Sequence, residues 1–194
     1  MKEIFYTLQG EGHNAGRPAV FVRFGGCNLW SGREEDRAEA ICNFCDTDFI
    51  GGQNMAAINI ARRAVDLWPD NNVRRFCVLT GGEPSLQVDD ELLGYLEDAA
   101  FEIAIETNGT RPAPAVDWIT VSPKPNAKLV QQCGDEIKVI YGSVSPTDYD
   151  DLAFRYWYIQ PMDGADNMAH AARYCMEHPK WRLSLQMHKT VGLR

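Results

Sequence analysis

Apolar and polar positions along the chain follow two periods, which together predict an α/β fold. Runs rich in β-branched and aromatic residues predict strands at 2–8, 18–24, 75–80, 102–107, 117–121, 136–141, 156–160 and 182–187. Apolar residues three and four positions apart predict helices at 55–68, 89–99 and 165–177. Asn54 is the expected N-cap of the first helix. Strands and helices in this order are typical of a mostly parallel sheet.

The lengths of the chain and of its connections indicate which parallel fold to expect. A complete eight-unit barrel typically needs about 250 residues, whereas this chain has 194. The connection between the runs at 102–107 and 117–121 is too short for a crossover helix. We therefore predict one domain over residues 1–194, a partial TIM-like barrel with a mostly parallel sheet and fewer helices than strands.

Polar clusters, five of which contain glycine or proline, directly follow six of the predicted strands. They lie at 25–28, 80–84, 106–110, 122–124, 160–163 and 188–189. The C-terminal ends of parallel strands converge on one mouth in barrel-like folds, and ligands bind there. We therefore expect the six clusters to ring a single site, with His188 at its mouth.

Composition and charge narrow the class of protein. Apolar residues make up 45% of the chain and charged residues 24%, and the formal net charge is -8. An acidic balance argues against a nucleic-acid or membrane-surface partner, and no apolar run approaches the roughly 20 residues of a membrane span. The N-terminus lacks the pattern of a signal peptide. These features predict a cytoplasmic protein, in a compartment that keeps thiols reduced.

The six cysteines are the strongest chemical feature of the chain, because cysteines in a reducing compartment favour metal or catalytic roles. Cys42 and Cys45 form a C-x2-C pair, and the fourteen residues 28–41 separate this pair from Cys27. The stretch 29–41 is predicted to be a helical insertion, with Ser31 and Glu34 at capping-box spacing. A short helix there would bring Cys27 beside the pair.

Two kinds of metal centre fit three thiolates. A [4Fe-4S] cluster would keep one iron open for a further ligand, and a structural zinc ion would need a fourth ligand such as His13. The other cysteines have different environments. Cys77 lies within a buried strand and Cys175 on an apolar helix face, so both are expected in the core. Cys133 is placed in a polar loop, without a role.

These cysteines and the segments that follow the strands resemble the radical S-adenosylmethionine enzymes. The usual spacing there is C-x3-C-x2-C, whereas this chain has fourteen residues where three are usual. The run 27–49 resembles the expanded-spacing members of one family, 7-carboxy-7-deazaguanine synthase. The segments 8–12, 80–84, 106–110, 122–124 and 160–163 extend the resemblance over nearly the whole chain.

The resemblance implies an activity and its partners. The chain is expected to convert 6-carboxy-5,6,7,8-tetrahydropterin to 7-carboxy-7-deazaguanine and ammonia, on the way to queuosine. The implied cofactors are a [4Fe-4S] cluster, S-adenosylmethionine and Mg²⁺. A flavodoxin- or ferredoxin-type electron donor and a homodimer are also implied.

The resemblance also implies which residues bind each ligand. The cluster is expected on Cys27, Cys42 and Cys45, and Mg²⁺ on Thr47. S-adenosylmethionine is expected to contact Phe44, Cys45, Asp46, Gly82, Ser122, Pro123, Lys124, Gln160, Pro161, Met162 and Asp163. The substrate is expected to contact Leu8, Gln9, Gly10, Arg23 and Thr80. The guanidinium fork of Arg23 suits the substrate carboxylate. In the family the chain's last residue can also reach the substrate and is often Pro, whereas Arg194 stands there in this sequence, so the resemblance assigns no contact to it.

Ordinary structural roles stay open for several of these residues. Arg23 can form a structural ion pair, Gly82 a tight turn and Thr47 a turn cap through its hydroxyl. Lys124 and Asp163 can be solvated loop charges. For the whole protein, the alternatives are another radical S-adenosylmethionine enzyme, such as a glycyl-radical activase, and a non-enzymatic zinc-binding module.

Overall fold

A computed structural model describes residues 1–70 and 72–193, in which eight strands form one sheet in sequence order. The strands are β1 (Glu3–Leu8), β2 (Pro18–Phe24), β3 (Arg75–Gly81), β4 (Phe101–Thr107), β5 (Trp118–Val121), β6 (Cys133–Ile140), β7 (Ala153–Gln160) and β8 (Trp181–Leu183). β1 runs antiparallel to β2, and every later neighbour pairs in parallel. β1 and β8 stand at the two edges of this sheet, so the predicted partial barrel is confirmed.

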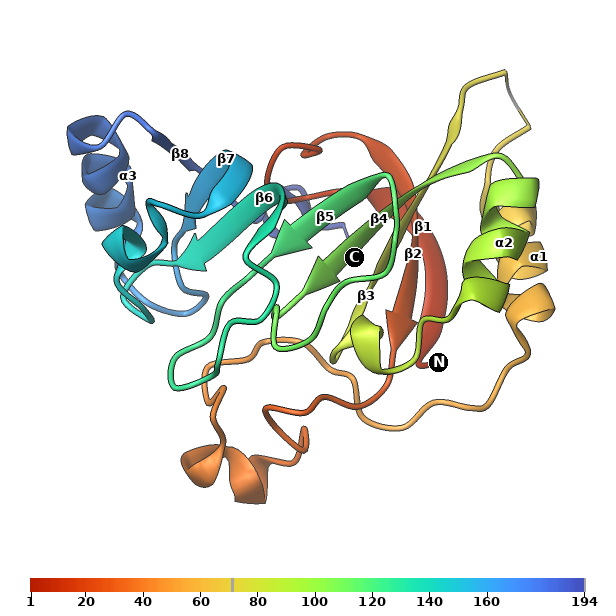
Figure 1. The fold of residues 1–194 in the computed structure, drawn as a ribbon, viewed down its shortest axis with the longest axis horizontal. Helices are drawn as coiled ribbons and strands as arrows, with labels where there is room; N and C mark the ends of the chain where they lie inside the picture. The colour runs from red at the N-terminus through yellow and green to blue at the C-terminus, as the bar shows by residue number, and fades with distance from the viewer. Residues whose placement is uncertain (71, 194) are drawn as a thin grey trace.

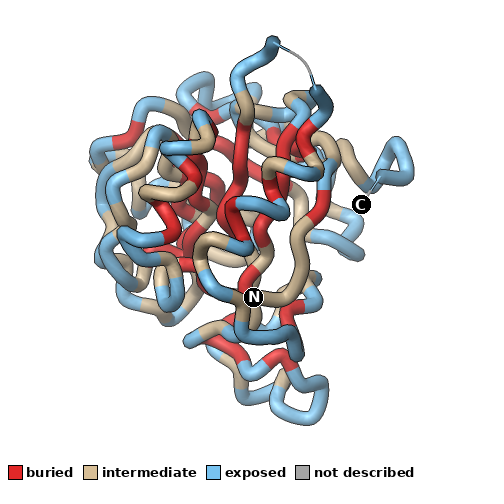
Figure 2. The backbone as a smooth tube through the Cα atoms, turned by 90° about the vertical axis from the view of Figure 1, so that its right-hand side faces the viewer, coloured by how far each residue is buried: buried red, intermediate tan, exposed pale blue. Residues whose placement is uncertain are grey.

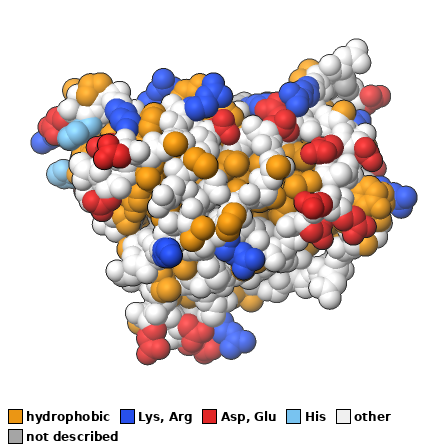
Figure 3. Space-filling view, viewed as in Figure 1, with side chains coloured by type: hydrophobic (Ala, Val, Ile, Leu, Met, Phe, Trp, Pro, Cys, Tyr) orange, Lys and Arg blue, Asp and Glu red, His pale blue; other side chains and the backbone are white. Residues whose placement is uncertain are grey.

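Helices cover the two ends of the sheet and leave its middle to extended chain (Figure 1). α1 (Ala57–Leu67) and α2 (Asp90–Asp98) lie beside β1–β4, and α3 (Met168–Glu177) lies beside β7 and β8. Within the described residues, the β4–β5 and β5–β6 connections contain no helix. Hydrophobic side chains are therefore visible over the middle of this face (Figure 3). None of the helices described is long and apolar enough to cross a membrane.

Two apolar clusters hold these elements together. The larger joins α1 and α2 to β1–β4, and the smaller joins α3 to β5–β8. Buried positions accordingly concentrate along the strands and on the inner faces of the helices (Figure 2). Cys77 is fully buried in the larger cluster, and Cys175 packs partly buried against the smaller one, as expected. Cys133 differs from expectation, because it begins β6 and is exposed.

The start of the first helix differs from the prediction. α1 begins at Ala57, two residues later than expected, and its N-cap is Ala56, whose side chain makes no capping hydrogen bond. Asn54 is therefore part of the preceding irregular segment and does not cap the helix. In α2, by contrast, the Asp89 side chain accepts a hydrogen bond from the Leu92 amide at 2.9 Å, so the acidic start of that helix works as a cap.

The last predicted strand is shorter than 182–187. β8 ends at Leu183, and residues 187–190 form the short helix α4 (Met187–Thr190). The Met187 amide donates to the Gly10 carbonyl at 2.9 Å, so this segment bonds to the β1–β2 loop and not to a neighbouring strand. The apolar residues at 183, 185 and 187 alternate as in a strand, which explains the longer prediction. The segment does not extend β8, because it bonds to a loop.

The insertion at 29–41 projects from the sheet and contains a 3-10 helix, η1 (Glu34–Glu39), not an α-helix (Figure 1). The expected capping box does not form, because Ser31 Oγ donates to Asp36 at 2.6 Å and Glu34 pairs with Arg37. Arg37 also lies over the Trp30 ring and donates to the carbonyls of Asn43 and Cys45 at 2.9 and 3.1 Å. The insertion thus braces the Cys42–Cys45 turn.

Candidate active site

One cavity of about 660 Å³ lies among the segments that follow the parallel strands. All six polar clusters contribute to its wall, through Cys27, Thr80, Gly81, Gly82, Glu106, Thr107, Asn108, Ser122, Lys124, Gln160, Pro161, Met162, Asp163, His188 and Lys189. The prediction that the six clusters surround one cavity is therefore confirmed. Its sixth contribution comes from α4 and not from the end of a strand.

The structure brings nearly all the candidate ligand residues to this cavity. The three cysteines, Thr47 and the candidates for S-adenosylmethionine and substrate binding line it, with one exception among the described residues. That exception is Pro123, which is buried and does not contribute to the wall. Arg194 lies outside the described residues. The shared cavity makes the assigned contacts geometrically compatible, and the individual roles stay predictions.

The three candidate cluster cysteines differ in acidity, because burial raises the pKa of Cys27 and the hydrogen bond to Cys45 raises the pKa of Cys42, whereas the pKa of Cys45 is lowered. All six cysteines of the chain are free. The Leu29 amide and the Asn108 side chain donate to Cys27 Sγ at 3.5 and 4.0 Å. A hydrogen bond from the Cys42 thiol lowers the pKa of Cys45 to about 6, and the Thr47 amide acts in the same direction. N–H donors around cysteine sulfur are a feature of iron–sulfur sites, where they tune the cluster.

A single-ion zinc site fits this arrangement less well. Among the described residues, no group of three or more His, Cys, Asp or Glu side chains is placed to hold one metal ion. The three thiolates of a [4Fe-4S] cluster bind separate irons, so their sulfurs lie farther apart than the ligands of a single metal ion. His13, the expected fourth zinc ligand, instead stacks on Tyr156 and Trp118 at centroid distances of 4.1 and 5.0 Å. The three cysteines stay the predicted cluster ligands.

The Gly81–Gly82 turn packs directly against the beginning of the cysteine loop. A Cβ at position 82 would lie 1.9 Å from the Gly26 carbonyl oxygen, so only glycine fits there. The Gly82 amide bonds to Phe24 O and the Glu83 amide to Gly26 O, at 3.1 and 2.9 Å. The predicted tight turn is thus present, and the same backbone also faces the cavity.

Glu83 of this turn is fully buried and joins it to the next strand end. Its carboxylate accepts hydrogen bonds from Thr107 Oγ1 at 2.6 Å and from the Asn108 amide at 2.7 Å. It also accepts from the Ser85 amide at 3.1 Å. Asn108 in turn contacts Cys27, so the buried carboxylate connects the glycine turn to the cysteine environment.

Glu106 links two of the candidate substrate residues that line the cavity. Its carboxylate accepts from Gln9 Nε2 at 2.8 Å and from Thr80 Oγ1 at 3.0 Å. These contacts join the β1–β2 loop, β3 and β4. They hold hydrogen-bond donors and acceptors in fixed positions, where these groups can bind the polar edge of a heterocyclic ligand.

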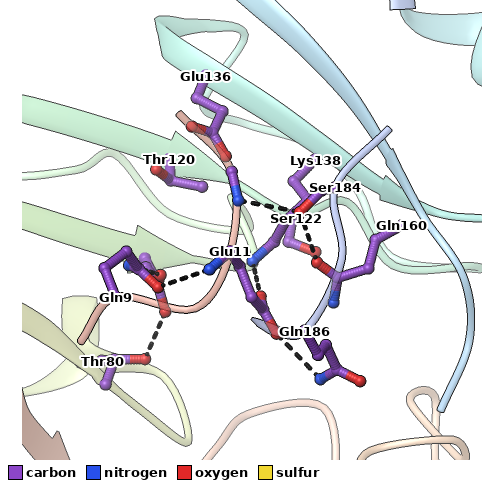
Figure 4. Close-up of polar contacts among 12 residues, drawn as sticks. Gln9, Glu11, Thr80, Thr120, Ser122, Glu136, Lys138, Gln160, Ser184 and Gln186 are labelled. Carbon is purple, nitrogen blue, oxygen red and sulfur yellow. Dashed lines mark hydrogen bonds and ion pairs between the residues drawn. The ribbon is translucent and has the colours of Figure 1, made fainter. Parts of the chain in front are cut away.

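A buried charged network lies behind the loop that carries Gln9. Lys138 forms an ion pair with Glu11, and Gln186 donates to Glu11 at 2.9 Å (Figure 4). Burial opposes the charge of Lys138, but the carboxylates of Glu11, Glu106 and Glu136 outweigh it and raise the lysine pKa. Burial also favours a protonated Glu11, yet the Lys138 charge and hydrogen bond prevail and lower the Glu11 pKa. Both groups are therefore held in their charged forms.

The edge strands β1 and β8 do not pair with each other, and residues 9–13 fill the gap between them. The Gly12 amide donates to Ser184 Oγ, and the His13 amide donates to Glu136, both at 2.9 Å. A Cβ at Gly12 would lie 2.0 Å from the Glu136 carboxylate, and the backbone there has φ +64, so the loop requires glycine. Burial raises the pKa of Glu136 to about 7. The shape of the candidate substrate loop thus depends on β6 and on the C-terminal segment.

Sequence reasoning missed Lys138, Glu136 and Gln186. A recognisable pattern exists for the first two, because Glu136 and Lys138 alternate with Ile137 and Val139 along one strand. A strand inside a barrel is covered on both faces, so its polar face must point to the interior. For Gln186 the sequence offers no comparable indication, because its partners lie on distant loops.

Comparisons with known proteins identify the family. No protein-family model matches the chain. A 7-carboxy-7-deazaguanine synthase from Bradyrhizobium diazoefficiens is 52% identical over 206 residues, and one from Burkholderia multivorans is 53% identical over 205 residues. Each alignment covers 100% of this chain and 98% of the relative. The crystal structure of QueE from Escherichia coli matches with a TM-score of 0.69 and 27% identity, over 97% of this chain and 93% of that one. The chain therefore belongs to the 7-carboxy-7-deazaguanine synthase family.

Proposed function

We propose that this chain is a radical S-adenosylmethionine lyase that converts 6-carboxy-5,6,7,8-tetrahydropterin to 7-carboxy-7-deazaguanine and ammonia in queuosine biosynthesis. Membership of a family named for that product supports the activity. The structural observation that carries the proposal is the shared cavity. Three free thiols line the same space as Arg23 and the Gln9–Glu106–Thr80 contacts.

Cys27, Cys42 and Cys45 would hold a [4Fe-4S] cluster in this cavity. When bound and reduced, such a cluster supplies the electron that splits S-adenosylmethionine and yields the radical that takes hydrogen from the substrate. Phe44, Asp46, Gly82, Ser122, Lys124 and residues 160–163 would hold the S-adenosylmethionine beside it, with Pro123 shaping the wall from behind. Lys124 Nζ donates to the Ser122 carbonyl at 2.8 Å, which orders this part of the wall.

The chain's own part in the reaction is orientation of the substrate and exclusion of water. Arg23 would bind the substrate carboxylate, while Leu8, Gln9, Gly10 and Thr80 would contact the ring. The Glu106 carboxylate fixes the side chains of Gln9 and Thr80 before any ligand arrives. A site organised in this way has little reorganisation left when the substrate binds.

An anaerobic turnover assay tests the proposed function. Protein with a reconstituted cluster, S-adenosylmethionine, reductant and 6-carboxytetrahydropterin should produce 7-carboxy-7-deazaguanine and one equivalent of ammonia. A glycyl-radical activase would instead cleave S-adenosylmethionine without using the pterin, and a zinc module would do neither. Cleavage of S-adenosylmethionine with no pterin product would therefore reject the proposal.

Arg23 provides a prediction about substrate binding. It donates from Nε to Glu3 at 2.9 Å, so the structural ion pair exists, and the residue lines the cavity as well. Arg23→Lys keeps the charge but loses the planar fork. We expect the KM for the pterin to rise by about tenfold or more, while cleavage of S-adenosylmethionine without substrate stays near the parent rate. The exposed Arg33→Lys is the matched control, and equal losses of both activities in Arg23→Lys would contradict the carboxylate role.

Thr47 supports a further proposal, in which Mg²⁺ bridges its hydroxyl and the bound substrate. Thr47 lines the cavity together with Cys45, Asp46 and Arg23. Mg²⁺ takes oxygen ligands and usually keeps several waters, so one protein group and a substrate carboxylate are a suitable set. The metal site would then be complete only with substrate present.

The Mg²⁺ proposal predicts a specific loss of metal stimulation. Added Mg²⁺ should raise pterin turnover by the parent enzyme, and Thr47→Ala should lose this stimulation while its cluster absorbance is unchanged. Thr47→Ser retains the hydroxyl and should keep the stimulation. Turnover by the parent that is indifferent to Mg²⁺ and to a chelator would exclude the bridge.

The remaining proposals concern the localisation, oligomeric state and electron donor of the enzyme. We propose a cytoplasmic homodimer of one domain over residues 1–194, served by a flavodoxin- or ferredoxin-type donor, with no direct nucleic-acid or membrane partner. Six free cysteines suit a reducing compartment, and a single continuous sheet supports one domain. The net charge of -8 gives no general attraction to nucleic acid. The dimer and the donor rest on the family resemblance.

A further inference from the structure

Residues 184–190, which we call the C-terminal strap, contact three loops of the cavity at once. Gln186 Nε2 donates to Glu11 Oε1 at 2.9 Å and to Asp46 Oδ2 at 3.1 Å. Lys189 Nζ contacts Asp46 Oδ2 at 2.7 Å and Asp163 Oδ2 at 2.8 Å. Figure 4 shows the contact between Gln186 and Glu11. Two side chains of one short segment thus join elements that are far apart in the sequence.

The three loops serve different ligands in the proposed function. Glu11 directly follows the candidate substrate residues Gln9 and Gly10, whereas Asp46 and Asp163 are candidates for binding S-adenosylmethionine. Neither Gln186 nor Lys189 is among the candidate ligand contacts, although both line the cavity. Gln186 and Lys189 therefore contact both the loop assigned to the substrate and the loops assigned to S-adenosylmethionine.

Backbone and hydroxyl contacts seat the strap firmly on the substrate loop. The Met187 amide donates to the Gly10 carbonyl at 2.9 Å. Ser184 Oγ accepts from the Gly12 amide at 2.9 Å and donates to Gln160 Oε1 at 3.0 Å. Gln160 is itself a candidate cofactor residue. A displacement of the substrate loop must therefore move the strap, and the strap carries Gln186 and Lys189 with it.

The charge of Lys189 links the strap to two residues that are assigned to S-adenosylmethionine binding. The carboxylates of Asp46 and Asp163 lie on either side of a single ammonium group, that of Lys189. Without that positive charge, the two carboxylates would repel each other and their loops would lose a common partner. The side chains are partly exposed, with 39% for Lys189, 37% for Asp46 and 48% for Asp163, so water weakens these contacts in the free enzyme. A bound ligand that excludes water would strengthen them.

We propose that Gln186 and Lys189 are positioning residues that couple the S-adenosylmethionine site to the pterin site. Each ligand orders a loop that the strap shares, so each ligand strengthens binding of the other by the same factor. This inference rests on the proposed function. It assigns the two residues to communication between the ligands and not to contact with either.

Equilibrium binding in the absence of reductant tests the coupling without turnover. The Kd of S-adenosylmethionine is measured on anaerobic enzyme with its cluster oxidised, with and without saturating 6-carboxytetrahydropterin. For the parent, we expect the pterin to lower this Kd by about two- to fivefold, the range that partly exposed ion pairs supply. In Lys189→Ala and in Gln186→Ala, we expect the ratio of the two Kd values to be close to one. Lys189→Arg should preserve the ratio.

Lys180→Ala is the matched control. Lys180 pairs with Asp150, and its side chain is 38% exposed against 39% for Lys189, but it does not line the cavity. This variant should keep the parent ratio. Cluster absorbance confirms that each variant is loaded, and partial unfolding would weaken binding with and without pterin alike, leaving the ratio unchanged.

The outcomes separate this inference from the function beneath it. If the parent turns over the pterin but shows a ratio of one, or if Lys189→Ala and Gln186→Ala keep the parent ratio, the coupling role is wrong and the proposed function stands. If the parent binds neither ligand and forms no product, the proposed function fails and the inference fails with it.

Discussion

Replacing Cys27, Cys42 or Cys45 by alanine is expected to abolish both cluster incorporation and formation of 7-carboxy-7-deazaguanine. Three thiolates are the smallest set that holds a [4Fe-4S] cluster while keeping one iron open. Each of the three thiols lines the cavity, and the insertion braced by Arg37 holds the Cys42–Cys45 turn in place. Iron and sulfide content, with the visible absorbance of anaerobically reconstituted protein, measures the loss.

Two other cysteines provide controls for these variants. Cys133→Ala removes an exposed thiol on β6, and Cys175→Ala removes a partly buried thiol on α3. Both should retain the cluster and turnover, apart from a modest loss of stability in Cys175→Ala. A full cluster in Cys27→Ala would show that the third ligand has been assigned to the wrong residue.

Lys138→Met is expected to reduce the free energy of unfolding by about 3–5 kcal/mol, because it leaves the Glu11 carboxylate buried without its partner. The side chains of Lys138 and Glu11 are only 8% and 15% exposed. For a chain of this length, such a loss corresponds to a fall in Tm of roughly 6–20 °C. Thermal unfolding followed by intrinsic fluorescence at pH 7 measures it.

The pH dependence of this deficit identifies its cause. In the parent, the folded-state pKa of Glu11 lies below its ordinary value, so the pair adds stability above the unfolded pKa of about 4.3 and loses it as pH falls through the folded value. In Lys138→Met the carboxyl is buried without a cation, which raises its pKa and favours protonation. The deficit should therefore shrink as the pH is lowered from 7 toward 5. Lys180→Met, at the exposed Asp150 pair, should cost less than about 1 kcal/mol at either pH.

A double substitution gives the most direct test of the buried pair. Glu11→Gln combined with Lys138→Met removes both charges and should recover part of the stability lost in Lys138→Met alone. If Lys138→Met melts like the parent, Glu11 does not depend on Lys138. If the double variant is no more stable than the single one, the loss does not come from an unpaired carboxylate.

Local patterns in the sequence were sufficient to predict most elements and the place of the site. The strands, the amphipathic helices α1, α2 and α3 and the absence of a crossover helix between β4 and β5 were recognised because periodicity and connection length involve neighbouring residues. The cavity followed from a general property of parallel strands, whose C-terminal ends lie at one mouth. The Cys27, Cys42 and Cys45 spacing, together with the other motifs, was sufficient to identify the family.

Helix starts and the last strand were less predictable, because their boundaries depend on partners that are distant in the chain. Asn54 has the chemistry of an N-cap, yet α1 begins after Ala56. The segment after Leu183 has a strand-like apolar period, yet its backbone bonds to the loop at Gly10. His13 was considered as a metal ligand, and its stacking on Trp118 and Tyr156 depends on β5 and β7.

The sequence by itself determined the α/β class, the family and the segments that surround one cavity, because each of these is encoded in short runs of residues. Only the tertiary structure decided which side chains form the hydrogen bonds and ion pairs that hold the cavity loops together. Glu11 and Lys138 lie 127 residues apart in the chain, and Gln186 and Asp46 lie 140 residues apart. No local pattern links such pairs. They meet because the antiparallel β1 directs its following loop into the open seam beside β8, where buried charges must find partners.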